Sequence, residues 1–132
     1  MTVFVDTSAM YAVLDSDDTN HAGASVAWKH LLDRVSDLLT TNYVLLEVSV
    51  LLQNRLGLRA LRTFQEDIAP LVRVDWIGEQ QHQAAAGAVL AAGRKKLSLV
   101  DCVSFESMRR HGVHAVFCYD RHFREQGFEI IA

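Results

Sequence analysis

The spacing of hydrophobic and polar positions changes along the chain, and these changes predict alternating strands and helices. Short apolar and β-branched runs, typical of buried strands, occur at 2–5, 38–41, 71–74, 113–118 and 128–131. Longer segments with helical spacing of their apolar residues occur at 8–14, 22–35, 43–56, 58–67, 77–92 and 99–111. Because strands alternate with helices, the pattern predicts an α/β fold with a parallel sheet.

Several predicted helix boundaries carry residues that commonly begin or end helices. These are Gly57, Gly93 and Gly112 as C-terminal caps, and Asn42, Asp75 and Ser98 as N-terminal caps. We expect the 58–67 helix to stop before Pro70, because the residue before a proline avoids helical backbone angles. The chain contains no repeat and no linker-like segment, so we expect a single domain over residues 1–132.

The composition is that of a globular protein. Half of the 132 residues are hydrophobic and 22% are charged, which excludes a disordered chain. The longest nearly apolar stretch, 43–52, contains Glu47 and is well short of the roughly 20 residues that a membrane span needs. The first residues lack the basic and apolar segments of a signal peptide, so we expect a cytoplasmic protein without a membrane partner.

Charge is distributed unevenly along the chain. Residues 1–93 carry eleven acids and six bases, net −5, whereas residues 94–132 carry five acids and seven bases, net +2. The basic clusters in the second segment are solvated surface or contacts to a polyanion such as RNA. Among them we expect Arg121, next to Asp120, to contact an RNA phosphate.

Two acids directly follow predicted strands. Asp6 comes after the first strand, and Asp120 comes just after the strand that ends near Cys118. The carboxyl ends of parallel strands meet at one edge of the sheet, where ligands bind in open α/β folds. The alternative interpretation is local, with Asp6 as the N-cap of the next helix and Asp120 as a turn residue.

A third acid, Glu47, lies on the apolar stripe of its predicted helix. Its neighbours three and four residues away include Tyr43, Val44 and Leu51. A buried carboxylate needs a cation, a hydrogen-bond donor or a proton, because loss of its hydration costs several kcal/mol. The sequence allows a functional site here, a salt bridge to an arginine such as Arg55 or Arg73, or a side chain that extends to the edge of the buried region.

The fourth acid, Asp101, opens a predicted helix at Ser98-Leu99-Val100-Asp101. Its spacing from Ser98 is that of a capping box, which is a purely structural explanation. The apolar residues that surround it, Val100 and Cys102 with Val103 and Phe105 beyond, indicate that the first helical turn is packed into the protein. Asp101 is therefore either a cap or a member of an acidic site.

If the four acids converge, they need a counter-cation, because neighbouring carboxylates raise each other's pKa. Ligation by oxygen alone favours Mg²⁺ or Mn²⁺ and leaves coordination positions for water and phosphate. Such a site is suited to phosphodiester hydrolysis by metal-activated water. Two other functions stay open: a non-catalytic nucleic-acid or protein-binding module, and a metal-dependent small-molecule phosphatase.

Four short motifs contain these acids and span nearly the whole chain. They are Val3-Phe4-Val5-Asp6-Thr7-Ser8, Thr41-Asn42-Tyr43-Val44-Leu45-Leu46-Glu47, Leu97-Ser98-Leu99-Val100-Asp101 and Cys118-Tyr119-Asp120-Arg121-His122-Phe123. In this order and spacing the chain resembles the PIN-domain ribonucleases, and within them the VapC-like toxins of bacterial toxin–antitoxin pairs. The family often has Thr or Ser where this chain has Cys118.

The resemblance implies a fold, a site and partners. It implies a three-layer α/β/α fold with a short parallel sheet in the order 3-2-1-4-5. Asp6, Glu47, Asp101 and Asp120 are then the metal-binding acids of a Mg²⁺- or Mn²⁺-dependent endoribonuclease, with Ser8 as a supporting polar residue. It also implies a cognate antitoxin and a homodimer, and a surplus of leucine in 45–61 would suit such interfaces.

Overall fold

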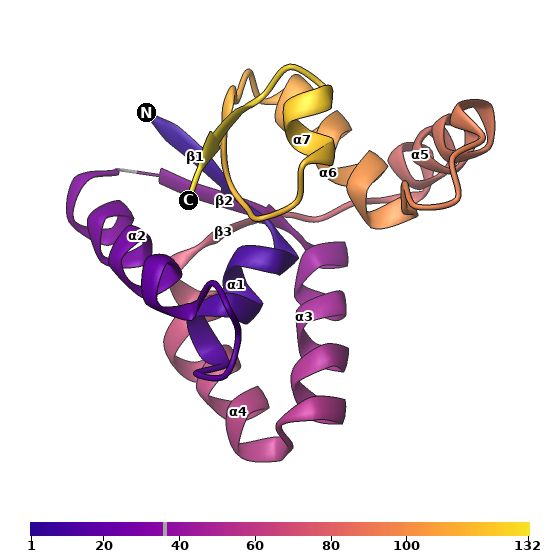
Figure 1. Cartoon of the computed structure of the whole chain (residues 1–132). Coiled ribbons are helices and arrows are strands. Elements are labelled where there is room, and N and C mark those ends of the chain that lie inside the picture. Colours follow the sequence, from indigo (N-terminus) through magenta and orange to yellow (C-terminus); the bar gives the residue numbers. More distant parts are fainter. Residues whose placement is uncertain (36) are drawn as a thin grey trace.

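The computed structural model describes residues 1–35 and 37–132, and its centre is a five-stranded parallel sheet (Figure 1). The strands are β1 (Thr2–Val5), β2 (Asp37–Thr41), β3 (Arg73–Asp75), β4 (Ala115–Phe117) and β5 (Glu129–Ile131), in the order β3-β2-β1-β4-β5. Val3 is opposite Leu38 on one side and Ala115 on the other. The predicted fold class and strand order are confirmed.

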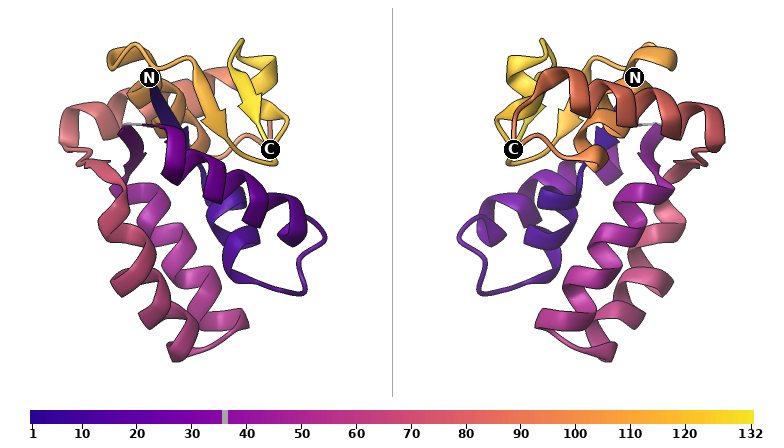
Figure 2. Two further views of the ribbon diagram at one scale, coloured as in Figure 1. Left: turned by 90° about the vertical axis from the view of Figure 1, so that its left-hand side faces the viewer. Right: turned by 90° about the vertical axis from the view of Figure 1, so that its right-hand side faces the viewer.

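Helices connect the strands and cover both faces of the sheet. They are α1 (Thr7–Leu14), α2 (His21–Arg34), α3 (Asn42–Arg55), α4 (Leu58–Thr63), α5 (Glu79–Ala92), α6 (Leu99–Arg110) and α7 (His122–Glu125). Right-handed crossovers place α1 to α4 on one face and α5 to α7 on the other. Figures 1 and 2 show α3 and α4 side by side, projecting away from the sheet.

The core lies between the sheet and the helices on each face. Val3, Phe4 and Val5 of the central strand are fully buried, because helices cover both faces of β1. On the face of α6 and α7, the rings of Phe105 and Phe123 meet edge to face with their centroids 4.9 Å apart. No helix of the described residues combines the length and apolar composition that a bilayer crossing needs.

Several predicted boundaries are wrong, and the reasons are local. Thr41 rather than Asn42 caps α3, since its hydroxyl accepts from the amide of Val44 at 3.2 Å, while Asn42 accepts from the amide of Ile77. Gly78 rather than Asp75 precedes α5, because β3 extends to Asp75 and α5 begins only at Glu79.

The predicted 58–67 helix does not stop as one regular element before Pro70. It continues from α4 into a π-helical turn, η1 (Phe64–Ile68), and a 3₁₀ turn, η2 (Ala69–Leu71), that contains Pro70. Proline is accommodated there because the first residues of a helical turn have no intrahelical acceptor for their N–H groups. The prediction of a cap at Ser98 is confirmed by a complete capping box with Asp101.

Candidate functional site: an acidic cavity at the carboxyl edge of the sheet

The structure places all four predicted acids in the wall of one cavity of about 360 Å³. Asp6 follows β1, Asp120 follows β4, Asp101 lies in the first turn of α6, and Glu47 projects from α3. The strand order β2-β1-β4 brings the first two acids together, since β1 and β4 are direct neighbours. Thr7, Ser8, Tyr11, Asp18, Asn20, Leu51, Arg55 and Tyr119 complete the lining.

Asp6 is held in place by the helix that it caps. Its Oδ2 accepts from the backbone amide of Ser8 at 3.3 Å and from the Ser8 hydroxyl at 2.8 Å. The same hydroxyl oxygen accepts from the amide of Tyr119 at 2.9 Å, which connects the end of β4 to the start of α1. Ser8 therefore orients Asp6, in keeping with the supporting position predicted for it.

Asp101 and Asp120 are also oriented by their own backbone. Asp101 Oδ2 accepts from the amide of Ser98 at 3.2 Å, and Asp120 Oδ1 accepts from the amide of His122 at 2.9 Å. The second oxygen of each carboxylate, like that of Asp6, accepts no hydrogen bond from the described residues. Asp101 and Asp120 can therefore accept a backbone hydrogen bond and also belong to the acidic site, because the two interactions use different carboxylate oxygens.

Glu47 is half-buried, and the salt bridge proposed as its alternative explanation is absent from the described residues. Arg73 instead forms two hydrogen bonds with Asp37, at 3.1 and 2.8 Å. Arg55 lines the cavity but lies over the ring of Tyr11, 5.2 Å from its centroid. Neither arginine neutralises Glu47.

The electrostatics of the cavity follow from burial and from the proximity of like charges. Burial raises the pKa of Asp6 to about 7, with a further increase from Asp101, while the hydrogen bonds from Ser8 act in the opposite direction. Burial likewise raises the pKa of Asp101, with Asp120 adding to the increase and the Ser98 amide opposing it. These carboxylates are costly to ionise in the protein alone, so the cavity favours a cation.

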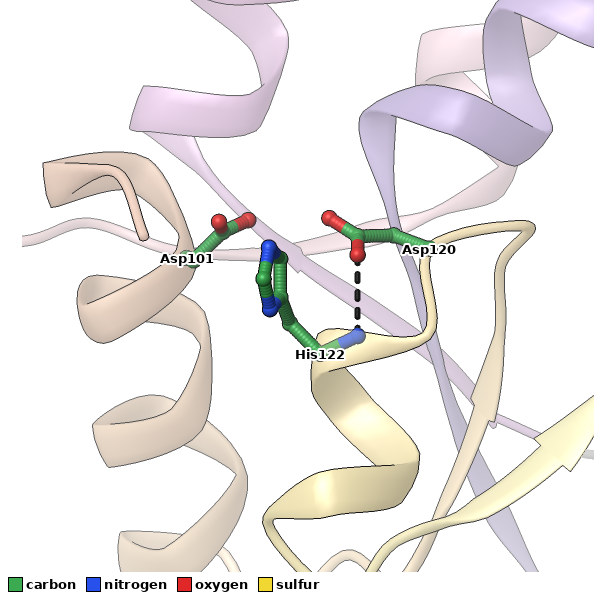
Figure 3. A group of neighbouring side chains, drawn as sticks. All are labelled: Asp101, Asp120 and His122. Carbon is green, nitrogen blue, oxygen red and sulfur yellow. Dashed lines mark hydrogen bonds between the residues drawn. The ribbon is translucent and has the colours of Figure 1, made fainter. Parts of the chain in front are cut away.

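His122 joins the acids, and sequence reasoning missed it. One atom of each of Asp101, Asp120 and His122 lies within 4.8 Å of the other two, and Figure 3 shows a ring nitrogen of His122 directed toward both carboxylates. The sequence signal that could have identified His122 is its position two residues after Asp120. The short helix α7, which carries His122 at its first turn, was not among the predicted elements.

The remaining predicted contacts lie outside the cavity. Arg121 is exposed at the start of α7 and is absent from the cavity lining, so a contact with RNA stays a prediction. Cys118 is fully buried, and its thiol donates to the carbonyl oxygen of Asp120 at 3.5 Å. The leucines of 45–61 are divided: Leu52 is buried, whereas Leu46 and Leu58 are 65% and 69% exposed.

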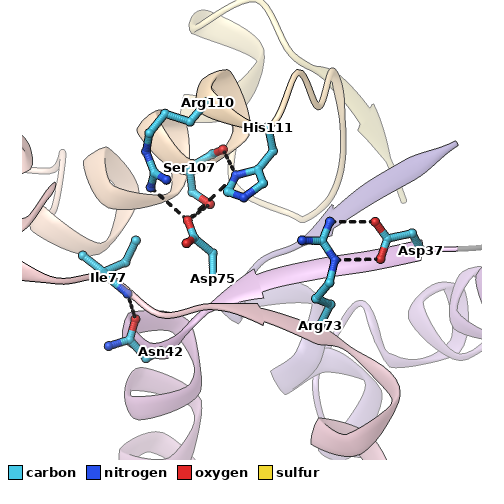
Figure 4. A network of polar contacts seen from close by, with 8 residues as sticks. All are labelled: Asp37, Asn42, Arg73, Asp75, Ile77, Ser107, Arg110 and His111. Atoms are coloured by element: carbon cyan, nitrogen blue, oxygen red, sulfur yellow. Dashed lines mark hydrogen bonds and ion pairs between the residues drawn. The ribbon is translucent and has the colours of Figure 1, made fainter.

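Acids elsewhere in the sheet have protein partners. Asp75, at the end of β3, accepts from the Ser107 hydroxyl at 2.7 Å and from Arg110 at 2.9 Å (Figure 4). Asp37 accepts from Arg73 and from the Thr2 hydroxyl, and the hydrogen bonds from Arg73 lower its pKa. Among residues 1–35 and 37–132, Asp75 and Asp37 form ion pairs with arginines, whereas the four cavity acids form none with a lysine or arginine.

The donor set suits a hard divalent cation. Carboxylate oxygens that point into one cavity, with free coordination positions for water, fit Mg²⁺ or Mn²⁺. Asp6 Oδ1, Asp101 Oδ1 and Asp120 Oδ2 are the oxygens without hydrogen bonds among the described residues. Burial and, to a lesser extent, like-charge repulsion raise the pKa values of Asp6 and Asp101, and a bound cation would offset both.

Comparisons with known proteins agree with this geometry. The family described as "PIN domain" matches residues 3–129. The chain is 29% identical over 127 residues to a Mycobacterium tuberculosis protein named "23S rRNA-specific endonuclease VapC20", covering 96% of this chain and 95% of that protein. The crystal structure of VapC20, titled a sarcin-ricin loop cleaving toxin, matches with a TM-score of 0.85. FitAcB from Neisseria gonorrhoeae, 16% identical over 100% of this chain and 97% of that one, matches with a TM-score of 0.67, which shows the fold alone.

Proposed function

The chain belongs to the PIN domain family, and from this premise we propose that it is a divalent-metal-dependent endoribonuclease, the toxin of a toxin–antitoxin pair. The observation that carries the proposal is the cavity in which Asp6, Glu47, Asp101 and Asp120 meet, none of them in an ion pair with a lysine or arginine of the described residues. The likeness to VapC20 over 96% of the chain supports ribonuclease activity and the toxin role.

The four acids hold Mg²⁺ or Mn²⁺ and bring it to the scissile phosphate. Such an ion, when bound, polarises the phosphate and lowers the pKa of a water molecule so that hydroxide is available near neutral pH. Ser8 holds Asp6 Oδ2 and leaves Oδ1 free, while the capping box leaves Asp101 Oδ1 free. Hydrolysis then needs no covalent enzyme intermediate, and no nucleophilic side chain is required of the protein.

The substrate that we propose is RNA. Ribosomal RNA is the first candidate, because the similar M. tuberculosis protein is named a 23S rRNA-specific endonuclease. The cavity also has Asn20, Tyr11 and Arg55 in its lining, whose polar groups suit an RNA phosphate bound beside the acids. Arg121, exposed at the N-cap of α7, is the residue that we propose to contact a flanking phosphate.

An antitoxin and a second copy of the chain are the proposed protein partners. Tyr43, Leu46, Val50, Leu51 and Val100 line an apolar hollow of about 300 Å³, which shares Glu47 and Leu51 with the acidic cavity. A partner seated there would bury exposed leucine and cover the acids together. Light scattering of the purified chain tests the dimer: a monomer at high concentration would contradict it.

Cleavage of total RNA tests the proposed activity. Purified wild-type protein in Mn²⁺ should give discrete fragments that disappear with EDTA and with Asp6→Asn. Asp37→Asn serves as the matched control, because Asp37 is a paired acid outside the cavity. Intact RNA with the wild type and both variants would contradict the proposed endonuclease activity and favour a binding module. Hydrolysis of a chromogenic phosphate monoester by a protein that leaves RNA intact would favour a phosphatase.

A further inference from the structure

His122 is a buried imidazole directed at two carboxylates. The residue is 9% exposed, and its Nδ1 is buried. Figure 3 shows the ring beside Asp101 and Asp120, with one nitrogen facing their oxygens. The other ring nitrogen is the one that a ligand between Asp101 and Asp120 would contact.

The other side of the ring faces a third carboxylate, that of Glu125. His122 Nδ1 lies 3.6 Å from Glu125 Oε2, and the same Glu125 oxygen accepts from Arg94 at 2.9 Å. The nitrogen that faces Asp101 and Asp120 is therefore Nε2. Histidines that bind metals through one nitrogen commonly present the other N–H to a carboxylate, which fixes the ring and its tautomer.

The spacing of the three groups fits one metal ion. Metal ligands in an octahedral shell at about 2.2 Å from the ion are roughly 3 Å apart when adjacent and about 4.4 Å apart when opposite. The ligand atoms of Asp101, Asp120 and His122 lie within 4.8 Å of one another. The first turn of α6 carries Asp101, and the segment after β4 carries Asp120 and His122, so the backbone already brings the three side chains together.

We propose that His122 is a metal ligand, which with Asp101 and Asp120 forms a mixed nitrogen and oxygen site that favours Mn²⁺ over Mg²⁺. The inference rests on the proposed function and refines its cofactor. Magnesium strongly prefers oxygen ligands, whereas imidazole is a good ligand for transition metals. Glu125, held by Arg94, acts as a positioning residue that orients the His122 ring.

Electron spin echo spectroscopy of the Mn²⁺-loaded, tag-free protein tests the ligand directly. The wild type should show ¹⁴N modulation, which should change to ¹⁵N frequencies when the protein is labelled with ¹⁵N-histidine. His122→Gln should abolish the nitrogen signal and weaken Mn²⁺ binding at least about tenfold, with a smaller effect on Mg²⁺ binding. His114→Gln, at an exposed position before β4, should leave signal and affinity unchanged.

A second variant keeps the test independent of folding defects in His122→Gln. Glu125→Gln should retain the nitrogen signal and weaken Mn²⁺ binding about tenfold, as expected for loss of an orienting carboxylate. Bound Mn²⁺ without nitrogen modulation in the wild type would overturn the inference and leave the carboxylate site intact. Failure of the wild type to bind Mn²⁺ at all would instead contradict the metal site of the proposed function.

Discussion

Two groups of aspartates differ in the hydrogen-bond partners that the protein provides for them. Asp75 and Asp37 each accept hydrogen bonds from an arginine and from a hydroxyl group. Asp6 and Asp101 accept only from neutral N–H and O–H groups, and Asp101 lies beside Asp120. The charge of the first group is neutralised within the fold, whereas the second group has no such partner among the described residues and is costly to ionise without a bound cation.

Because of this difference, the pKa values of the two groups shift in opposite directions. Arg73 lowers the pKa of Asp37, so its ionised form stabilises the fold, whereas burial raises the pKa of Asp6 to about 7, so its ionised form destabilises the fold. Stability alone would not favour an unneutralised buried acid. The cavity therefore carries a cost that a bound cation relieves.

The largest expected effect is on catalysis. Asp101→Asn should lower the rate of RNA cleavage by on the order of 10²–10³-fold, because a lost metal ligand removes several kcal/mol of transition-state stabilisation. Asparagine can still accept the hydrogen bond from the Ser98 amide, so the helix cap should survive. Single-turnover cleavage rates measure the effect.

Asp75→Asn is the matched control for the catalytic comparison. It removes the charge that pairs with Arg110 but leaves the cavity untouched, so it should lower the free energy of unfolding by about 1–3 kcal/mol and leave the cleavage rate within about twofold. If Asp75→Asn were as inactive as Asp101→Asn, the division between the two groups of acids would be wrong.

The next effect is on stability without metal. Between pH 3.8 and about 7 the native state holds a proton on Asp6 that the unfolded chain has released, so the wild type loses stability as pH rises through this window. Asp6→Asn avoids this cost. In EDTA at pH 8 it should raise the free energy of unfolding by about 2 kcal/mol, within an upper bound of about 4 kcal/mol set by roughly three pKa units.

Urea unfolding at several pH values measures the difference between Asp6→Asn and the wild type. The difference should shrink as pH falls from 8 to 4, because both native proteins are then neutral at this position. A variant less stable than the wild type at pH 8 would show that Asp6 is a stabilising cap rather than a costly buried acid.

The smallest expected effect is on stability, from the ion pair between Arg73 and Asp37. Arg73→Gln should lower the free energy of unfolding by less than about 1 kcal/mol at pH 7, because the side chains of Arg73 and Asp37 are 51% and 32% exposed. The cost should vanish below the lowered pKa of Asp37, where the carboxylate is protonated. A cost that persists at pH 2 would indicate lost packing instead of a lost ion pair.

Much of the fold was predictable because apolar runs and caps are local signals. The strand order followed from the family resemblance, and β1 was predicted at its observed bounds. The start of α5 was predicted two residues too early, because Ile77 fits the apolar spacing of the 77–92 segment. In the structure the backbone amide of Ile77 instead donates to the side chain of Asn42. Tertiary contacts of this kind leave no local signal.

The acids of the site were predictable from their positions at strand ends and on an apolar stripe, although their catalytic and metal-binding roles stay predictions. His122 was missed because its relevance depends on α7, a four-residue helix with no periodic signal. The salt bridge from Glu47 to Arg73 was excluded only by the structure, since the sequence does not indicate that Arg73 pairs with Asp37.

Calorimetric titration of Mn²⁺ into the wild type, Asp6→Asn and Asp75→Asn tests the central claim most directly. The account predicts that the wild type and Asp75→Asn bind Mn²⁺ with equal affinity, and that Asp6→Asn binds at least about tenfold more weakly. Equal binding by all three proteins, or no binding by the wild type, would contradict the claim that the unneutralised acids exist to hold a cation.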